Sequence, residues 1–268
     1  MKKRGIAIGD MHCGHLAGLT PPEYQDRVYK NSTTKRNKWV NLQQELWERY
    51  KGLLKKFAPY DFGLYLGDGV DGSGYRSGGS ELIRPDIDDQ IDMAVYVCNE
   101  VRRHATRNFD WAGVYGTPYH TGVNMDHENR IAKDAGFKKI GSHEWIDINK
   151  CIFDIKHHIP VSSIEYSRQT ALARERVNNL LWHEENLAPK ANIILRAHAH
   201  YHRYAGGPGW VSMTIPPLQG MGSKYGARQC SGLVDWGLLV VDVESDGSFD
   251  WHAETVTIEA QKAKVIKL

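Results

Sequence analysis

Five short segments of the sequence carry carboxylate or imidazole side chains, in a pattern suited to binding metal ions. They are Gly9-Asp10-Met11-His12, Gly67-Asp68-Gly69-Val70-Asp71, Gly116-Thr117-Pro118-Tyr119-His120, Lys156-His157-His158 and His198-Ala199-His200. Mixed carboxylate and imidazole ligands suit zinc, manganese, iron or nickel rather than calcium, which takes oxygen ligands. A single Asp-x-His or His-x-His pair is common by chance, but five such segments in one chain indicate a metal site.

Hydrophobic periodicity places most of these segments directly after predicted strands. Apolar strands are predicted at 5–9, 61–66, 111–115 and 192–196. In open α/β sheets ligands bind beyond the carboxyl ends of the strands, so we expect the polar segments to meet in one crevice. In an extended chain Asp10 and His12 would face the same side, and Cys13 would point away from them.

The remaining elements predict a layered α/β fold. Helices are expected over 36–57, 86–106, 126–135 and 167–187, and further strands at 144–156 (two strands), 210–215, 236–244 and 249–258. An Asp246-Gly247 turn joins the last two strands as a hairpin. The C-terminal strands are expected to form a second sheet packed on the first. No repeat or linker divides the chain, so we expect one domain over 1–268.

The composition excludes several classes of protein. Hydrophobic residues make up 41% and charged residues 25% of the chain, as in an ordinary globular protein. The formal net charge of +2 gives no overall field to attract DNA or an anionic membrane. No apolar run approaches the length of a membrane span or a secretory core, and the cysteines Cys13, Cys98, Cys151 and Cys230 have no CxxC spacing. We expect reduced thiols, a cytoplasmic location and no membrane partner; the oligomeric state stays open.

The order of the five segments resembles the calcineurin-like metallophosphoesterase superfamily. The signature of that superfamily runs Asp-x-His, Gly-Asp-x-x-Asp, Gly-Asn-His-Glu/Asp, His and Gly-His-x-His. The resemblance spans residues 9–200 and implies a two-sheet β-sandwich flanked by helices. The third segment, with Gly116, Thr117 and His120, is most similar in form to phosphoesterases encoded by phages and prophages.

The resemblance also implies a centre of two divalent transition metal ions, with manganese first and iron, zinc or nickel as alternatives. It assigns Asp10, His12 and His200 to the first ion, Asp68 to a bridging position, and His198 with a histidine of the 157–158 pair to the second ion. His157 is favoured because it alternates with the apolar Phe153 and Ile155 along a predicted strand. His158 remains an alternative.

The third segment departs from the superfamily pattern. Thr117 stands where the asparagine is expected, and His120 falls three residues later rather than immediately after. A threonine hydroxyl is a poorer ligand than an amide oxygen, so Thr117 or His120 fills the second site, or that site is more weakly held. Asp71 and His120 fit the implied pair in which a carboxylate orients the histidine that protonates the leaving group.

The resemblance implies a dinuclear metal-dependent phosphoesterase, in which a metal-bridging hydroxide attacks phosphorus in line. We expect phosphodiesters, including nucleic acid or nucleotides, because Tyr75 and Tyr119 could stack on bases. Arg76, or Arg84, is the expected phosphate contact in the loop after Gly72, where protein phosphatases carry an arginine. The alternatives are a phosphomonoesterase or protein phosphatase of the same fold, and a non-catalytic interaction module that has lost its metals.

Overall fold

The computed structural model describes residues 1–25, 34–221, 234–259 and 265, with the side chains of 34–37 and Arg76 left out. The strands are β1 (Lys3–Ile8), β2 (Tyr60–Tyr65), β3 (Ala105–Val114), β4 (Phe137–Gly141), β5 (Glu144–Ile148), β6 (Cys151–Ile155), β7 (Ile193–Arg196), β8 (Tyr204–Gly207), β9 (Trp210–Thr214), β10 (Gly237–Val243) and β11 (Phe249–Thr255). The helices are α1 (Thr34–Phe57), α2 (Ile87–Arg102), α3 (Pro118–Thr121), α4 (Asp126–Asp134) and α5 (Arg168–Glu184).

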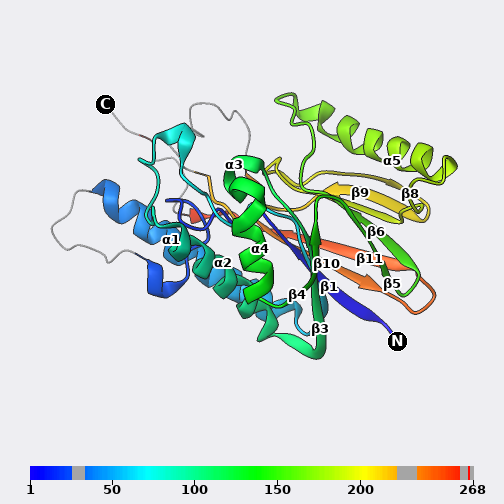
Figure 1. Ribbon diagram of the computed structural model, residues 1–268, viewed down its shortest axis with the longest axis horizontal. Helices are drawn as coiled ribbons and strands as arrows, with labels where there is room; N and C mark the ends of the chain where they lie inside the picture. The colour runs from blue at the N-terminus through cyan, green and yellow to red at the C-terminus, as the bar shows by residue number, and fades with distance from the viewer. Residues whose placement is uncertain (26–33, 222–233, 260–264, 266–268) are drawn as a thin grey trace.

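Two β-sheets pack face to face, and helices cover the outer face of each (Figure 1). The first sheet has the order β11-β10-β1-β2-β3-β4, and the second has the order β5-β6-β7-β9-β8. Helices α1, α2 and α4 lie on the first sheet, and α5 lies on the second. This arrangement confirms the predicted α/β fold of two sheets flanked by helices.

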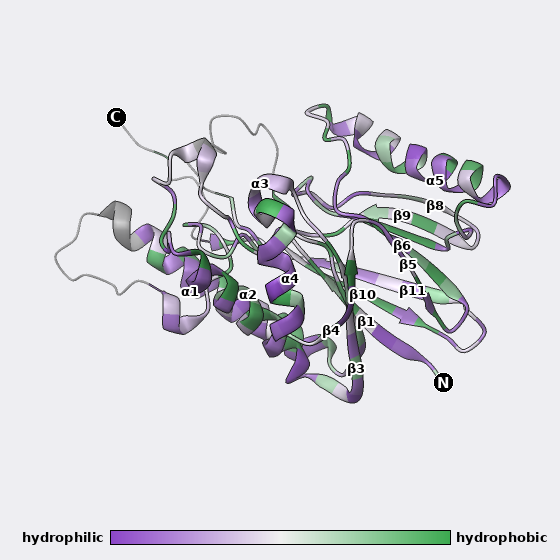
Figure 2. Cartoon of the chain, viewed as in Figure 1, coloured by the Kyte–Doolittle hydropathy of each residue, from purple (hydrophilic) through white to green (hydrophobic). Residues whose placement is uncertain are grey.

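The apolar strands of the first sheet are buried on both faces. Ile6 and Ile8 of β1 point toward α1 and α2, whereas Ala7 points into the space between the sheets. The same alternation places Tyr65 on the helix side and Leu64 between the sheets. Strands covered on both faces are expected to be continuously apolar, as these are. Figure 2 shows this hydrophobic interior, with hydrophilic residues on the outer faces of the helices.

The C-terminal strands depart from the prediction. Strands β10 and β11 do form the expected hairpin, but β10 pairs antiparallel with β1 and so extends the first sheet. The second sheet is built from β5 to β9 instead. The apolar pattern of 237–243 predicts a buried strand, but it does not say which sheet the strand joins.

Other differences lie in short elements and at boundaries. Helix α2 ends at Arg102 rather than near 106, because β3 begins at Ala105. Sequence periodicity did not predict β4, β8 or α3, each of which has five residues or fewer. Such elements are too short to show a period.

Candidate metal centre

The polar segments that follow β1, β2, β3, β6 and β7 meet at one end of the two sheets. The backbone of Asp10 donates to Gly67 O over 3.0 Å, and that of His12 donates to Asp68 O over 3.0 Å. The His198 backbone N–H donates to Asp10 Oδ2 over 3.0 Å. These bonds join the first, second and fifth segments, as expected for a crevice beyond the strand ends.

Asp10, His12 and His200 form the first group of candidate ligands. One potential ligand atom from each lies within 4.8 Å of the others. His200 Nε2 is 3.6 Å from Asp10 Oδ1. His12 Nε2 is buried and has no hydrogen-bond partner. A buried polar atom without a partner is costly, so this nitrogen fits a ligand position for a cation.

Asp68, His157 and His198 form the second group, with Thr117 among them. Thr117 Oγ1 is 3.1 Å from Asp68 Oδ2, 3.2 Å from His157 Nε2 and 3.2 Å from His198 Nδ1. Two ligands that each lie about 2.1 Å from one ion are separated by about 3.0 to 3.4 Å in octahedral or tetrahedral arrangements. The threonine hydroxyl therefore stands at ligand spacing from all three side chains, whereas His120 is not part of this group.

Asp68, a member of the second group, also lies close to the first. Its Oδ2 atom is 3.1 Å from His157 Nε2 in the second group and 3.9 Å from His12 Nε2 in the first. The Thr117 backbone N–H donates to its other oxygen over 2.6 Å. One carboxylate within reach of both groups is suited to contact two cations at once.

The backbone of the candidate ligands is not extended, contrary to the reasoning from strand alternation. Asp10 and His12 have φ values of 47° and 45°, and Asp68, His198 and His200 also have positive φ values. Such conformations cost roughly 1–3 kcal/mol each and cluster at functional sites. Cys13 nevertheless points away, since its thiol donates to Leu19 O over 3.3 Å.

The charges in the groups are strongly coupled. Burial opposes ionisation of Asp68, but the nearby histidines, His157 above all, together hold the Asp68 pKa below its usual value. Burial likewise lowers the pKa of His157, but Asp68, with smaller contributions from Asp10 and the Leu66 carbonyl, raises that pKa to about 10. Burial and then His157 lower the pKa of His198 to about 4, so this imidazole is neutral and can act as a ligand.

The two histidines of the fourth segment have different positions. His157 is buried, and its Nδ1 donates to Leu66 O over 2.6 Å, which turns Nε2 toward Asp68. His158 is exposed and belongs to neither ligand group, although its ring lies 4.8 Å from that of His198. The geometry places His157, rather than His158, among the candidate ligands.

Asp71 and His120 interact differently from the expected pair. The Asp71 carboxylate accepts from His12 Nδ1 over 3.2 Å, whereas His120 Nδ1 donates to the backbone O of Asp71 over 2.7 Å. The prediction that the Asp71 carboxylate contacts and orients His120 is therefore wrong, because that carboxylate faces the His12 ring. Burial and then His12 lower the pKa of His120 to about 4. Its Nε2 thus carries a lone pair.

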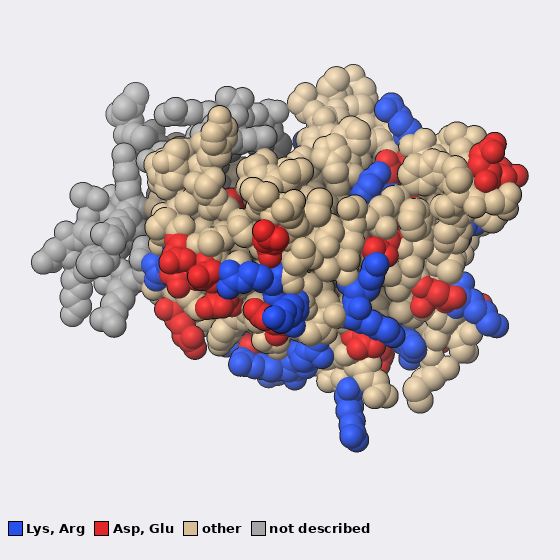
Figure 3. Space-filling view, in the orientation of Figure 1, with Lys and Arg blue, Asp and Glu red and all other residues tan. Residues whose placement is uncertain are grey.

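Several loops that follow the site segments carry exposed apolar side chains. The Tyr119 side chain is 41% exposed, and its ring lies 3.9 Å from that of His120. Tyr75 is also exposed, whereas the side chain of Arg76 lies outside the described residues. Other exposed apolar side chains of the surrounding loops are Val123, Val161, Ile164 and Tyr166. Figure 3 shows that charged side chains gather over α2 and α4, while the surface around α3 is mostly uncharged.

Sequence reasoning missed Glu128 of α4. This buried carboxylate accepts from the Gly116 backbone N–H over 2.7 Å and from the Tyr65 hydroxyl over 3.0 Å. Burial and then Asp68 raise its pKa to about 7. Glu128 therefore fixes the loop that carries Thr117. The available signal was its spacing from Ile131, which places both residues on the inner face of one helix.

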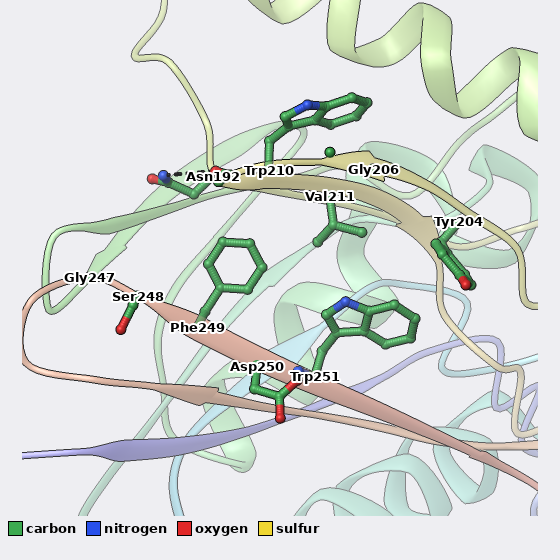
Figure 4. Close-up of a pocket in the computed structure, with 12 residues that line it drawn as sticks. Asn192, Tyr204, Gly206, Trp210, Val211, Gly247, Ser248, Phe249, Asp250 and Trp251 are labelled. Atoms are coloured by element: carbon green, nitrogen blue, oxygen red, sulfur yellow. Dashed lines mark hydrogen bonds between the residues drawn. The ribbon is translucent and has the colours of Figure 1, made fainter.

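Two hollows lie near the edges of the sheets. One, of about 310 Å³, borders Thr117 and His157. The larger, of about 500 Å³, lies between the β8–β9 hairpin and β11 (Figure 4). There Phe249 and Trp251 point toward Val211, and the lining contains no histidine, cysteine, lysine or arginine. The larger hollow therefore lacks the chemistry of the ligand groups.

Comparison with known proteins gives distant similarities in structure. No protein-family model and no curated protein matches the chain. Similar solved structures include Vps29 from Cryptosporidium parvum, with 11% identity over 96% of this chain and 98% of that chain and a TM-score of 0.46. Zinc-complexed Vps29 from Entamoeba histolytica has 12% identity, coverages of 94% and 98%, and a TM-score of 0.40. An archaeal phosphodiesterase has 9% identity, coverages of 94% and 99%, and a TM-score of 0.42. TM-scores this low indicate neither a reaction nor a partner for this chain.

The structure also bears on the expectations about membrane spans and cysteines. None of the helices in the described part of the chain is long and apolar enough to cross a membrane. Cys13, Cys98 and Cys151 are buried free thiols, whereas Cys230 lies outside the described residues.

Proposed function

We propose that this protein is a phosphodiesterase that depends on two divalent metal ions. The observation that carries the proposal is the pair of ligand groups joined by Asp68. Both groups mix carboxylate and imidazole, which suits manganese, iron, zinc or nickel, and we propose manganese as the working ion. When bound, two such ions activate water and neutralise charge on the phosphate.

The residues of the two groups and their neighbours have separate proposed roles. Asp10, His12 and His200 would hold one ion, His157, His198 and Thr117 would hold the other, and the Asp68 carboxylate is within reach of both groups. The Asp71 carboxylate accepts a hydrogen bond from His12 Nδ1, which turns Nε2 of that ring toward the site. Partners of this kind tune the affinity of a ligand rather than contacting the metal.

His120 is the proposed proton donor to the leaving oxygen. In the free protein its Nδ1 donates to Asp71 O, so Nε2 is the atom that can take up a proton. A phosphate anion bound nearby favours the protonated ring, because an opposite charge raises the pKa of an imidazole. Nε2 can then transfer that proton to the departing alkoxide.

Nucleotides or single-stranded nucleic acid are the proposed substrates. Tyr119, beside His120, and the exposed Tyr75 offer rings on which a base can stack. We propose Arg76 as a phosphate contact. Kinship with phage-encoded phosphoesterases and a cytoplasmic location belong to the same proposal.

Metal analysis and hydrolysis of bis-(p-nitrophenyl) phosphate with added Mn²⁺ test the proposal. Asp68→Asn should abolish turnover while the fold is retained, His200→Ala should empty the first ion position, and His198→Ala the second. Cys13→Ser is a suitable control, since this buried thiol follows His12 but faces Leu19. A protein that binds no transition metal and hydrolyses no diester would instead support a non-catalytic interaction module.

A further inference from the structure

A hollow of about 310 Å³ opens beside the second ligand group. Thr117 and His157 form one wall, and the rest of the lining comes from loops after β3, β4 and β6 and from the turn before α4. The rest of the lining includes Tyr115, Pro118, Met125, Ser142, Lys156 and His158. The hollow thus adjoins the position where the phosphate is proposed to bind.

The lining has little free charge. Lys156 Nζ lies 3.3 Å from a Glu175 carboxylate oxygen, which offsets its positive charge. The Tyr115 hydroxyl donates to Asn129 Oδ1 over 2.9 Å, so its ring rather than its polar end is available. Pro118 and the Met125 thioether are apolar, and a thioether makes favourable contacts with aromatic rings. A neutral, planar group matches this lining better than a charged one.

The volume limits what can enter. About 310 Å³ equals the space of roughly ten water molecules at about 30 Å³ each. That space accommodates one nucleoside or one aryl group. The hollow is therefore suited to a single substituent of a phosphodiester.

The position of His120 decides which substituent this is. His120 lies beside His12 and Asp71, with its ring centroid 4.6 Å from that of His12, and it does not line the hollow. The leaving group must face the proton donor. The hollow, on the Thr117 and His157 side, is then left for the group that stays on phosphorus.

We propose that this hollow is a specificity pocket for the non-leaving group of the substrate, and that it selects a neutral planar group the size of a nucleoside. The proposal rests on the phosphodiesterase function proposed above. It gives His158, which belongs to neither ligand group, a place in the pocket wall. It also favours short nucleotides over a long polyanionic strand.

Three p-nitrophenyl phosphodiesters test the pocket, because their leaving group is constant while the other substituent is methyl, phenyl or 5′-thymidyl. The variant Ser142→Trp places a bulky side chain in the wall of the pocket, and Met125→Trp does so from another loop. Val123→Trp is the matched control, because Val123 is 80% exposed on the same turn as Met125 but does not line the pocket.

For the wild type with Mn²⁺ we expect kcat/KM to rise at least tenfold from the methyl to the thymidyl ester. Ser142→Trp and Met125→Trp should each raise KM at least tenfold for the thymidyl ester, and change it less than threefold for the methyl ester. Val123→Trp should change neither. Equal effects on all three esters, or no effect in either pocket variant, would overturn the pocket while leaving the phosphodiesterase intact. A wild-type protein that hydrolyses none of the esters would overturn the phosphodiesterase itself, and the pocket with it.

Discussion

Replacing Asp71 separates two roles for this carboxylate. In the structure its Oδ1 atom is 3.2 Å from His12 Nδ1, and the other ring nitrogen of His12 is buried without a partner. Removing a partner of this kind typically lowers metal affinity about 10- to 100-fold, or about 1.4 to 2.8 kcal/mol. Asp71→Asn keeps an oxygen acceptor for Nδ1, so we expect a loss near tenfold. Asp71→Ala removes the acceptor, and we expect a loss near 100-fold.

The affinity of each variant for Mn²⁺ can be measured by competition with a fluorescent chelator, which resolves the two binding steps. Only the binding step of the ion held by His12 should change. At saturating Mn²⁺ we expect kcat for p-nitrophenyl and alkyl diesters to fall by the same small factor, within about threefold. The common factor follows because the metal ligand, and not the proton donor, is perturbed.

A matched control is Glu254→Gln, which alters a carboxylate 2.8 Å from His252 Nε2 on β11, in a pair that contains no candidate ligand. Its Mn²⁺ affinity should equal that of the wild type. The reasoning would be refuted if Asp71→Ala bound Mn²⁺ normally yet lost activity only toward alkyl diesters. That result would show that Asp71 acts through His120, as the motif alone suggested.

Three further predictions concern single side chains. His120→Ala should slow alkyl or nucleoside diesters at least about 100-fold and p-nitrophenyl esters much less, with metal content unchanged; a parallel loss of both activities and of metal would identify His120 as a ligand. Glu128 has a pKa raised to about 7 in the fold, so its contribution to stability is complete below about pH 4.5 and lost as the pH rises through 7. Urea unfolding of metal-free protein at pH 5 and 7.5 should therefore show a difference of up to about 3 kcal/mol in the free energy of unfolding that Glu128→Gln removes; equal pH dependence in both proteins would contradict it. Arg196→Met should cost about 3–5 kcal/mol of unfolding free energy, because it removes the buried guanidinium from Asp154 and Glu175 and leaves them with His143 and Lys156 as ion-pair partners. Arg130→Met, in an exposed ion pair, should cost less than about 1 kcal/mol in the same urea titration.

The strands and the meeting of the polar segments could be predicted because both depend on local pattern. A buried parallel strand is a continuous apolar run, and the residue after it lies at the ligand-binding edge of the sheet. Asp10, Asp68 and His198 therefore came together as expected. The sheet to which 237–243 belongs could not be predicted, because pairing with β1 depends on contacts more than 230 residues apart in the sequence.

The motif also could not predict which side chains of the site contact each other. The motif put Asp71 and His120 in one pair, but in the structure the His12 ring contacts the Asp71 carboxylate instead. The sequence did not identify Glu128 as part of the site for a related reason. A glutamate on an amphipathic helix is ordinarily solvated, and only the packing of α4 over Gly116 and Tyr65 buries this one.

The second ligand group depends on a buried ion-pair network directly behind it. Arg196, the last residue of β7, is 1% exposed and lies 2.8 Å from Asp154 of β6 and 2.6 Å from Glu175 of α5. Its guanidinium also donates to the backbone O of Asp154 over 3.1 Å, which ties the ends of the two strands together. His157 and His198 follow those ends within three residues.

Buried pairs of this kind add little net stability, but they restrict geometry. The spacing of His157 and His198 around Thr117 is therefore set by α5 and the second sheet, whereas Asp10, His12 and Asp68 are set by the first sheet. A cation in either group would contact residues that follow strands of both sheets. Loading with Mn²⁺ should therefore raise the unfolding temperature of the protein, and should raise it less in Arg196→Met, where the ends of β6 and β7 are no longer held together.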